Sequence, residues 1–443
     1  MKTKVSEPLL IMLVVAVFFS ALSFMVLPLK PVNFFSDILG KEQPVTPLKA
    51  TSKSAVSTSI DSTMLEMQLN LSYLKPFFAA LKTSKNTKRI GIGFFGDSMI
   101  EGDLVTNDFR KFMQAIFGGN GVGFVPITSV TAKFRSSIGH SFNDRWMAYN
   151  FAKNRPPKSL QCGPSGFVFS AEKDAMVQYS SSKEYFPFQS VRLFYGNQDS
   201  AQLVVKLDTT ERTIVLQPDC FVNSIELVEN RAVRKVKLTA SQSTNLAFYG
   251  CSFENGNGVY VDNYSFRGNS GVPLSIITPQ IYQGFDTYLN NKLIVLNYGL
   301  NVVTHNKGDY KWYETSFRKT IQHIKTAFPE ASILLIGIGD KAFRENGEWA
   351  TEPDIPIFIE LQKRLAKEEH IAFWSLYDAM GGYNSMKGWV ESKPALANQD
   401  YTHPNQRGAQ KIASLLFDFL MHGYKAYEES VDTVASKKDT ILP

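Results

Sequence analysis

Cysteine is scarce in this sequence of 443 residues, and its three copies follow no metal-binding pattern. No CxxC motif or Cys/His spacing suggests a zinc site. Cys162, Cys220 and Cys251 all lie in the middle third of the chain, so an exported protein could pair two of them and leave the third free. The sequence does not choose the pair. Nothing in the residue pattern requires a metal ion or a cofactor, and we expect neither.

Dense blocks of lysine and arginine are also missing. The net charge of +6 is spread along the chain, which argues against a basic patch of the kind that binds nucleic acid. We therefore expect no nucleic-acid partner. The residues give no indication of an oligomeric state.

One long uncharged run is present, and it lies at the N-terminus. Lys2 and Lys4 precede LLIMLVVAVFFSALSFMVL, which has about the length needed to cross a bilayer. The run is longer than an ordinary signal-peptide core and lacks a clear small-x-small cleavage site. We therefore interpret residues 1–28 as a membrane anchor, with a cleaved signal peptide as the alternative. Lysines on the short N-terminal side predict that the rest of the chain lies outside the cytoplasm.

The pattern then changes several times, which predicts more than one domain. Residues 29–60 are rich in Lys, Pro, Ser and Thr with little periodicity, and we interpret them as a flexible linker. Residues 61–142 begin an α/β pattern, with a helix expected in MLEMQLNLSYLKPFFAALK, a strand in IGIGF and a helix in NDFRKFMQAIF. This segment is the first part of an α/β domain.

Residues 143–264 show the alternation that half-buried strands produce. Short alternating runs are separated by turn residues, among them SVRLFYG, AQLVVKLD, NLAFYGCSFE and GVYVDNY. This pattern predicts an inserted β-sandwich or jelly roll. Over residues 265–428 the strands KLIVLNYG, SILLIGIG and IAFWSLYD alternate with amphipathic helices, which predicts a parallel sheet with helices on both faces. Residues 429–443 are expected to form a polar tail.

The stretch FFGDSMIEGD, Phe94 to Asp103, places Ser98 directly after an apolar strand. A serine on a strand-to-helix turn would have its backbone N–H at a helix N-terminus, where developing negative charge is stabilised. The alternative is that Asp97 or Ser98 simply caps the helix. Ligands of parallel α/β sheets bind at the carboxyl ends of the strands, and Ser98 stands at one such end.

Asp400 and His403 lie in QDYTHPNQRG, just before the last expected helix. With two residues between them, one tight turn can aim the carboxylate at one imidazole nitrogen while the other nitrogen faces a substrate site. An Asp-x-x-His pair is also common as a cap or a surface pair. Together with a strand-end serine, the pair gains weight as a functional site.

Two further strand ends carry possible hydrogen-bond donors. Asn301 follows the strand LIVLNYG in GLNVV, where its amide could point into the same crevice or complete an Asx turn. FRGNSGVP contains Gly268 and Gly271, either of which could bring a backbone N–H close to an oxyanion or be present for its positive φ. Four tryptophans could line a sugar site, although Trp374, within the strand IAFWSLY, is expected to be part of the core; they are Trp312, Trp349, Trp374 and Trp389.

In this order the four motifs resemble the SGNH (GDSL-type) hydrolases, whose sequence blocks carry a serine, a glycine, an asparagine and an Asp-x-x-His. FFGDSMIEGD matches block one, GNSGV block two, GLN block three and DYTHPN block five. The resemblance implies a catalytic triad of Ser98, His403 and Asp400. It also implies an oxyanion hole formed by the N–H of Ser98, the N–H of Gly271 and the side chain of Asn301.

Two positions depart from the family pattern. Gly268 competes with Gly271 for the block-two glycine, and Val302 stands where an acidic residue often follows the family's asparagine. The first departure leaves the glycine donor open between two positions. The second concerns the fine positioning of Asn301.

Three longer stretches narrow the resemblance. GDSMIEGD, GGNGVGFVP and YGCSFENGNGVYVDNYSFRGNSG look like the bacterial peptidoglycan O-acetylesterases, in which a β module resembling a carbohydrate-binding module is inserted before block two. This resemblance implies an esterase that removes acetyl groups from peptidoglycan through an acyl-serine intermediate. Such an enzyme would lie at the periplasmic face of the inner membrane, or free in the periplasm if the signal is cleaved. Two alternatives stay open: an O-acetyltransferase that uses the same triad on a glycan, and a non-catalytic glycan-binding protein.

Overall fold

The computed structural model of the chain describes residues 70–83, 87–183, 185, 187–196, 199–228 and 231–439. The predicted anchor and the predicted linker lie outside these residues. Within the described part of the chain, no helix combines the length and the apolar composition needed to cross a membrane.

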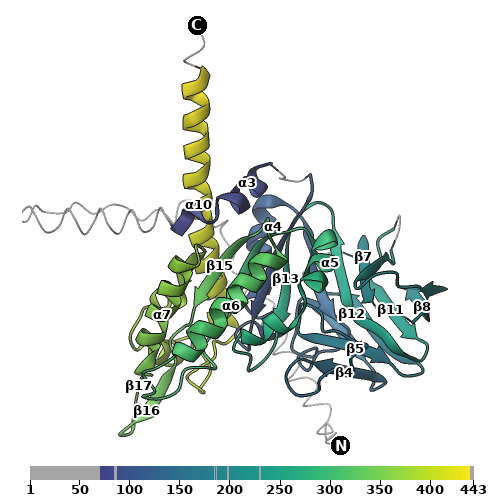
Figure 1. Cartoon of the computed structure of the whole chain (residues 1–443), viewed down its shortest axis with the longest axis horizontal. Helices are drawn as coiled ribbons and strands as arrows, with labels where there is room; N and C mark the ends of the chain where they lie inside the picture. Colours follow the sequence, from purple (N-terminus) through teal and green to yellow (C-terminus); the bar gives the residue numbers. More distant parts are fainter. Residues whose placement is uncertain are drawn as a thin grey trace, which may run out of the picture. The chain divides into compact units, whose positions relative to one another are not determined.

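A five-stranded parallel sheet forms the centre of the α/β part (Figure 1). Its strands lie in the order β13-β1-β14-β15-β18, and each neighbouring pair is parallel. Their bounds are β1 Arg89–Gly96, β13 Gly258–Ser265, β14 Asn291–Asn297, β15 Ser332–Gly337 and β18 Ala372–Ser375. Every residue of β15 is buried, as expected for a parallel strand covered on both faces.

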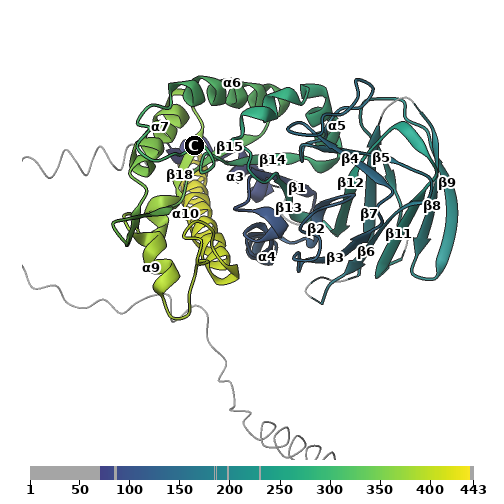
Figure 2. The same ribbon diagram turned by 90° about the horizontal axis from the view of Figure 1, so that it is seen from below.

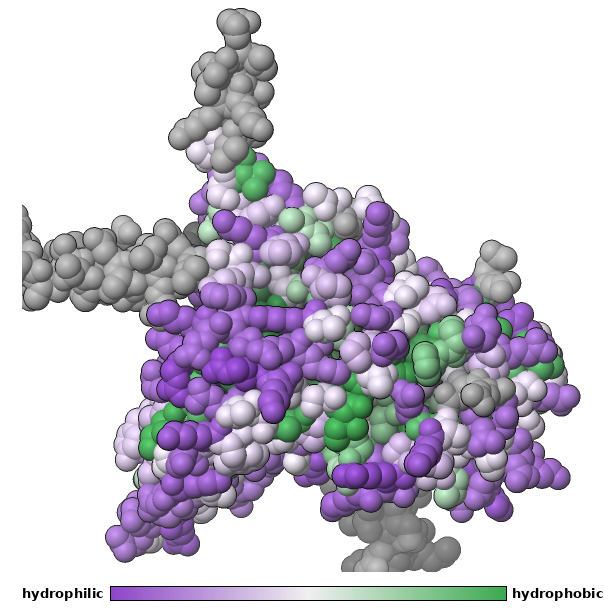
Figure 3. Space-filling view, viewed as in Figure 1, coloured by the Kyte–Doolittle hydropathy of each residue, from purple (hydrophilic) through white to green (hydrophobic). Residues whose placement is uncertain are grey.

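Helices cover both faces of this sheet, as the alternation of strands and helices predicts. Figure 2 shows α5, α6 and α7 along one face and α4 and α10 along the other. Their bounds, with that of α3, which precedes β1, are α3 Lys75–Thr83, α4 Thr106–Phe117, α5 Pro279–Leu289, α6 Lys311–Ala327, α7 Asp354–Glu368 and α10 Gln406–Asp439. Helix α6 buries Phe317, Ile321 and Ile324. The outer surface of α6 and α7 is mostly hydrophilic (Figure 3), so both helices are amphipathic.

Two antiparallel sheets form a β module beside the parallel sheet. One has the order β10-β7-β12-β5-β4 with β2 paired to β12, and the other has the order β3-β6-β11-β8-β9. The bounds are β2 Asn120–Pro126, β3 Ile138–Phe142, β4 Trp146–Asn150, β5 Phe167–Ala171, β6 Ala175–Ser181, β7 Ser190–Gly196, β8 Ala201–Leu207, β9 Thr210–Leu216, β10 Asn223–Glu226, β11 Lys235–Ala240 and β12 Ser243–Asn255. Both sheets contribute to one apolar core, with Leu193 and Phe253 from the first sheet and Leu238 from the second. Two sheets around a common core form a sandwich.

The segment GVYVDNY, which its alternation assigned to the β module, is instead β13 of the parallel sheet. It pairs with β1 in parallel register along its whole length. The alternation misleads because the polar side chains of β13 are buried and paired: Asp262 Oδ2 accepts from Arg89 at 2.8 Å, and its Oδ1 accepts from the backbone N–H of Phe124 at 2.9 Å. Strand pairing places the strands of the module within 120–255, not within the predicted 143–264.

Further elements surround the carboxyl edge of the parallel sheet. They are the hairpin strands β16 Ala342–Glu345 and β17 Glu348–Thr351, the short helices α8 Leu376–Met380 and α9 Ser385–Glu391, and the 3-10 turns η1 Glu101–Asp103 and η2 Val272–Ile276. Helix α10 continues to Asp439, so the predicted polar tail continues the last helix through most of its length.

Candidate active site

Ser98 lies just beyond the carboxyl end of β1, the strand that lies between β13 and β14 in the parallel sheet. Asp97 holds the turn, because its Oδ1 accepts a hydrogen bond from the backbone N–H of Met99 at 2.9 Å. The 3-10 turn η1 follows, and α4 begins only at Thr106. The expectation that the Ser98 N–H stands at the N-terminus of the long helix is therefore wrong. Asp97 makes the turn contact, which leaves the Ser98 hydroxyl for another partner.

That partner is an imidazole, in a continuous chain of hydrogen bonds. Ser98 Oγ lies 2.8 Å from His403 Nε2, and His403 Nδ1 lies 2.8 Å from Asp400 Oδ2. The structure therefore brings the three residues of the predicted triad together. A carboxylate at Nδ1 favours the tautomer with the proton on Nδ1, so that Nε2 accepts from the serine hydroxyl.

The turn that carries Asp400 and His403 is fixed by its own backbone. Asp400 Oδ1 accepts hydrogen bonds from the backbone N–H groups of Thr402 and His403, each at 3.0 Å. Partial burial alone would raise the pKa of Asp400, but the hydrogen bonds from His403 and Thr402 outweigh it and hold that pKa below its usual value. The carboxylate is therefore ionised at neutral pH and can stabilise a charged imidazole.

Asn301 follows β14 and reaches back to the Ser98 turn. Its Nδ2 donates to Asp97 Oδ2 at 2.6 Å and, with a longer bond, to the backbone oxygen of Asn269 at 3.3 Å. Because Asn269 follows β13, these bonds join the segments at the ends of three adjacent strands. Asp97 and Asn301 lie 204 positions apart, and no sequence motif indicated that they would pair.

Asp97 places a buried carboxyl group beside the nucleophile. Only 1% of the residue is exposed. Burial raises the pKa of Asp97 to about 6, although hydrogen bonds from Met99 and Asn301 and the nearby His403 act in the opposite direction. At neutral pH the group is still mostly ionised, so a negative charge lies one hydrogen bond from the Asn301 amide.

The block-two glycine is where the structure departs from the predicted site. The N–H of Gly271 donates to Asn269 Oδ1 at 2.9 Å, so it is already used within its own loop. A Cβ at Gly271 would lie 2.5 Å from Phe317 and 2.8 Å from the Tyr298 ring, which makes this glycine necessary for packing. Gly268 has φ 72°, and a Cβ there would meet nothing within 4 Å. The geometry argues against Gly271 as an oxyanion donor and leaves Gly268 as the candidate.

The hairpin of β16 and β17 packs against the turn that carries the histidine. The rings of Trp349 and Tyr401 stack with centroids 3.8 Å apart and planes at 8°. The backbone oxygen of Tyr401 accepts from the N–H of Ala342 at 3.0 Å. Tyr401 has φ 54°, a left-handed conformation that few residues other than glycine adopt. The hairpin therefore supports a strained residue that lies between the two triad members Asp400 and His403.

The described residues form neither a metal-binding group nor a disulfide. Within the described part of the chain, no group of three or more His, Cys, Asp or Glu side chains is placed to hold a metal ion. The thiols of Cys162 and Cys251 are buried and that of Cys220 is exposed, and all three are free. No pair among the three cysteines forms a disulfide.

Comparison with protein families gives one match. Residues 238–411 match the family model described as the GDSL-like Lipase/Acylhydrolase family. The matched segment includes Asn301, Asp400 and His403. It begins after Ser98, because most of the β module lies between Ser98 and residue 238 in the sequence. A search of curated proteins gave no match.

Comparison with solved structures shows the fold. A peptidoglycan O-acetylesterase superposes with a TM-score of 0.66 at 21% sequence identity, over 79% of this chain and 96% of the other. A family two carbohydrate esterase from Clostridium thermocellum, in complex with cellohexaose, matches with a TM-score of 0.26 at 12% identity, over 65% of this chain and 100% of the other. The first match extends over both the α/β part and the β module.

Proposed function

We propose that this chain, which contains a domain of the GDSL-like lipase/acylhydrolase family over residues 238–411, is a serine esterase that removes O-acetyl groups from a cell-envelope polysaccharide. Peptidoglycan is the proposed polysaccharide. The observation that carries the proposal is the chain of two 2.8 Å contacts that links Ser98, His403 and Asp400. The fold shared with a peptidoglycan O-acetylesterase supports the choice of substrate.

The first half of the reaction acylates the serine. His403 Nε2 takes the proton of the Ser98 hydroxyl as Oγ attacks the ester carbonyl, and Asp400 stabilises the imidazolium that forms. When the tetrahedral intermediate collapses, the bond to the sugar oxygen breaks and His403 returns the proton to that oxygen. The acetyl group remains bound to Ser98 Oγ as an ester.

The negative charge on the carbonyl oxygen needs fixed donors. The backbone N–H of Ser98 and the Asn301 amide supply them, with a third from the loop that contains Gly268. The Asn301 N–H that makes the longer 3.3 Å bond to the Asn269 oxygen is the one that an oxyanion can recruit. The shorter bond to Asp97 keeps the amide in place while this happens.

The second half of the reaction releases acetate. Water attacks the acetyl-serine with His403 again as the base. The Asp400 side chain is 49% exposed and that of His403 is 30% exposed, so water reaches this side of the site. An open site admits a sugar hydroxyl as well as water, so the experiment below, and not the exposure, identifies the acceptor.

The experiment is acetate release by the full chain from O-acetylated peptidoglycan, with acetylated xylan and a small aryl acetate as comparisons. We expect release without an added sugar acceptor, the highest kcat/KM on peptidoglycan, and loss of both release and fluorophosphonate labelling in Ser98→Ala. Activity in Ser98→Ala at the wild-type level would refute the proposal. Turnover that requires a sugar acceptor would show a transferase, and an unlabelled, inactive wild type would show a binding protein.

The cellular location belongs to the same proposal. An N-terminal anchor over residues 1–28 would tether the esterase at the periplasmic face of the inner membrane, where it meets peptidoglycan. Cell fractionation of the full chain and of a chain lacking residues 1–28 tests this. Protein in the soluble fraction that has been shortened by the length of the signal would argue for a cleaved signal.

A further inference from the structure

A pocket of about 190 Å³ lies where the β module meets the turn after Ser98. It is lined by η1, by the segment that follows β2, by parts of β3 to β5 and by the segment that follows β13. The backbone N–H of Glu101, which lines the pocket, donates to the backbone carbonyl oxygen of Ser98 at 3.4 Å. The pocket therefore begins one turn from the nucleophile, on the side of the β module.

Partly exposed apolar groups line part of this pocket. Phe167 and Phe266 are only partly buried; Phe266 stacks on Phe167 with centroids 4.8 Å apart and on Phe151 with centroids 4.6 Å apart. Val130 also lines the pocket and is 87% exposed. An aromatic surface that stays open to solvent is what the apolar face of a sugar ring packs against.

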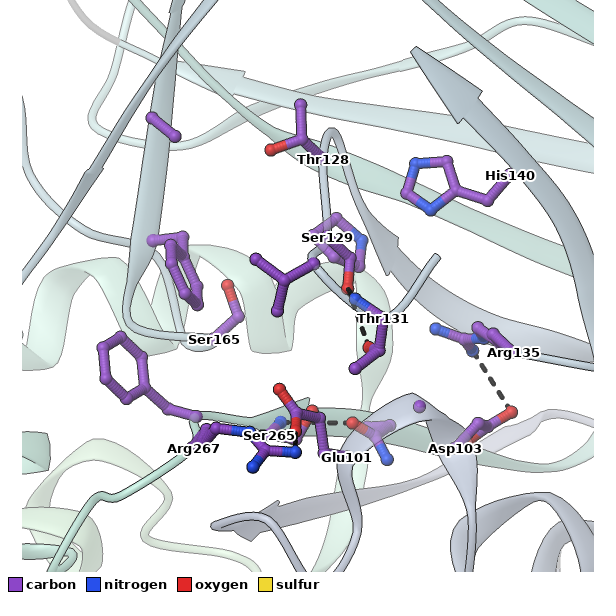
Figure 4. A pocket seen from close by; sticks show the side chains of 17 residues that line it. Glu101, Asp103, Thr128, Ser129, Thr131, Arg135, His140, Ser165, Ser265 and Arg267 are labelled. Atoms are coloured by element: carbon purple, nitrogen blue, oxygen red, sulfur yellow. Dashed lines mark hydrogen bonds and ion pairs between the residues drawn. The ribbon is translucent and has the colours of Figure 1, made fainter. Parts of the chain in front are cut away.

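Hydrogen-bonding groups line the rest of the pocket. Figure 4 shows Thr128 and Ser129 across the pocket from Glu101 and Arg267. Arg267 contacts one carboxylate oxygen of Glu101 twice, with Nε at 2.7 Å and Nη2 at 2.6 Å from Oε2. Among the described residues no donor reaches Glu101 Oε1, although the side chain is only 9% exposed. This oxygen is a fixed acceptor with no partner among the residues that the structure describes.

A second unpartnered acceptor lies in the same lining. The ring of His140 makes one hydrogen bond, from Nε2 to the backbone oxygen of Ile127 at 3.0 Å, which leaves Nδ1 as the acceptor of the neutral ring. This Nδ1 is buried and has no hydrogen-bond partner in the described part of the chain. Burial lowers the pKa of His140 to about 4, so the ring stays neutral in the physiological range. Because His140 Nδ1 has almost no accessible surface, Glu101 Oε1 is the acceptor that the hydroxyl or amide donors of a ligand can reach.

We propose that this pocket binds one pyranose ring of the acetylated polysaccharide, next to the unit that carries the scissile ester. The inference rests on the proposed esterase function and adds a sugar-binding subsite to it. The ring packs one face against Phe167 and Phe266 while its donors bond to Glu101 Oε1. The volume is below the roughly 300 to 1,000 Å³ of sites for drug-sized ligands, which suits one ring better than an extended chain.

The test measures binding in the full-length Ser98→Ala protein, which holds a glycan without turnover. Calorimetric titration with a tetrasaccharide of alternating N-acetylglucosamine and N-acetylmuramic acid should show saturable binding. In that background Glu101→Gln should raise Kd about tenfold, because a charged acceptor is lost from a buried hydrogen bond. Thr128→Val keeps the shape of the side chain and removes one hydroxyl, so it should raise Kd severalfold. This variant tests the subsite if Glu101→Gln does not fold.

Glu172→Gln is the matched control. Glu172 pairs with Arg145 at 3.5 Å on the exposed surface of the β module, and its loss should leave Kd unchanged. Three results would each overturn the subsite. The first is a Kd for Glu101→Gln and Thr128→Val that equals that of the Ser98→Ala parent, and the second is an equal rise in Kd for the control Glu172→Gln. The third is the absence of saturable binding. Acetate release by the wild-type chain is measured separately, so a failed subsite and a failed esterase proposal give different results.

Discussion

The carboxyl group of Asp97, next to the nucleophile, links two segments of the site. It accepts from the backbone of its own turn and from the amide of Asn301, so it links the nucleophile segment to the proposed oxyanion donor. Its burial makes its ionisation unfavourable, since a charge loses its hydration there. The fold therefore accepts a cost in stability at a site where it needs a fixed acceptor.

Asp97→Asn tests this cost through pH. The pKa of Asp97 is about 6 in the fold, above its ordinary value, so the wild-type protein loses stability as pH rises from about 4 through 6. The variant lacks this titration, and relative to wild type its free energy of unfolding should gain up to about 3 kcal/mol between pH 4 and pH 7. Urea denaturation of both proteins at each pH measures the difference. A constant difference across this range would show that Asp97 does not titrate in the fold.

Asn301→Ala separates an oxyanion donor from a turn residue. Loss of one preorganised donor should lower kcat about 10²-fold to 10³-fold with little change in KM, because the bond strengthens in the transition state. Kinetics with an aryl acetate and the melting temperature are measured together. A turn residue would behave in the opposite way, with a lower melting temperature and kcat near wild type.

The sequence indicated most of this site for a physical reason. Ser98, Asn301 and the Asp400–His403 turn follow strands or precede a helix, and the parallel sheet brings its carboxyl ends together whatever the distance in sequence. The choice between Gly271 and Gly268 stayed open because motif spacing cannot tell a glycine that donates its N–H from one that makes room for neighbouring rings. Only the packing against Phe317 and Tyr298 distinguishes these two uses.

At the scale of elements, the hairpin of β16 and β17 is the part that the sequence did not predict. Its two four-residue strands are too short for alternation to be visible, and it acts through contacts with a distant turn. The assignment of β13 to the β module was wrong for a related reason, because its polar residues are paired in the interior and are not exposed to water. The five-stranded core and its longer helices were predictable because their apolar periodicity is strong.

Trp349→Ala tests whether the hairpin positions the histidine turn. Removing the ring that stacks on Tyr401 takes support from a residue in a strained conformation, so the Asp400 to His403 segment should sample other geometries. We expect kcat to fall about tenfold with a small change in KM, because displacements of about 1 Å suffice for losses of this size or larger. Trp349→Phe should recover most of the activity. A raised KM with unchanged kcat would assign Trp349 to substrate binding.

At the scale of the whole molecule, the α/β part and the β module are coupled through Arg89. Its guanidinium pairs with Asp262 of the parallel sheet and with Glu254 of the β module, each at 2.8 Å, and also donates to the backbone oxygen of Leu289. Asp262 is fully buried, and its other oxygen accepts from Phe124 of the module. Burial opposes ionisation of Arg89, but the two carboxylates raise its pKa above the usual value. The two parts therefore share charges that neither could bury alone.

Arg89→Ala should consequently destabilise both parts at once. Removing one partner of a buried ion pair leaves uncompensated charge and costs about 3 to 5 kcal/mol. In urea, wild type should lose its β signal in circular dichroism and its esterase activity at the same concentration, while Arg89→Ala should unfold earlier and with separated transitions. Arg145→Ala, whose partners lie on the exposed surface, should change stability by less than about 0.5 kcal/mol. An Arg89→Ala protein as stable as wild type would mean that the backbone pairing of β2 with β12 and apolar contacts alone hold the two parts together.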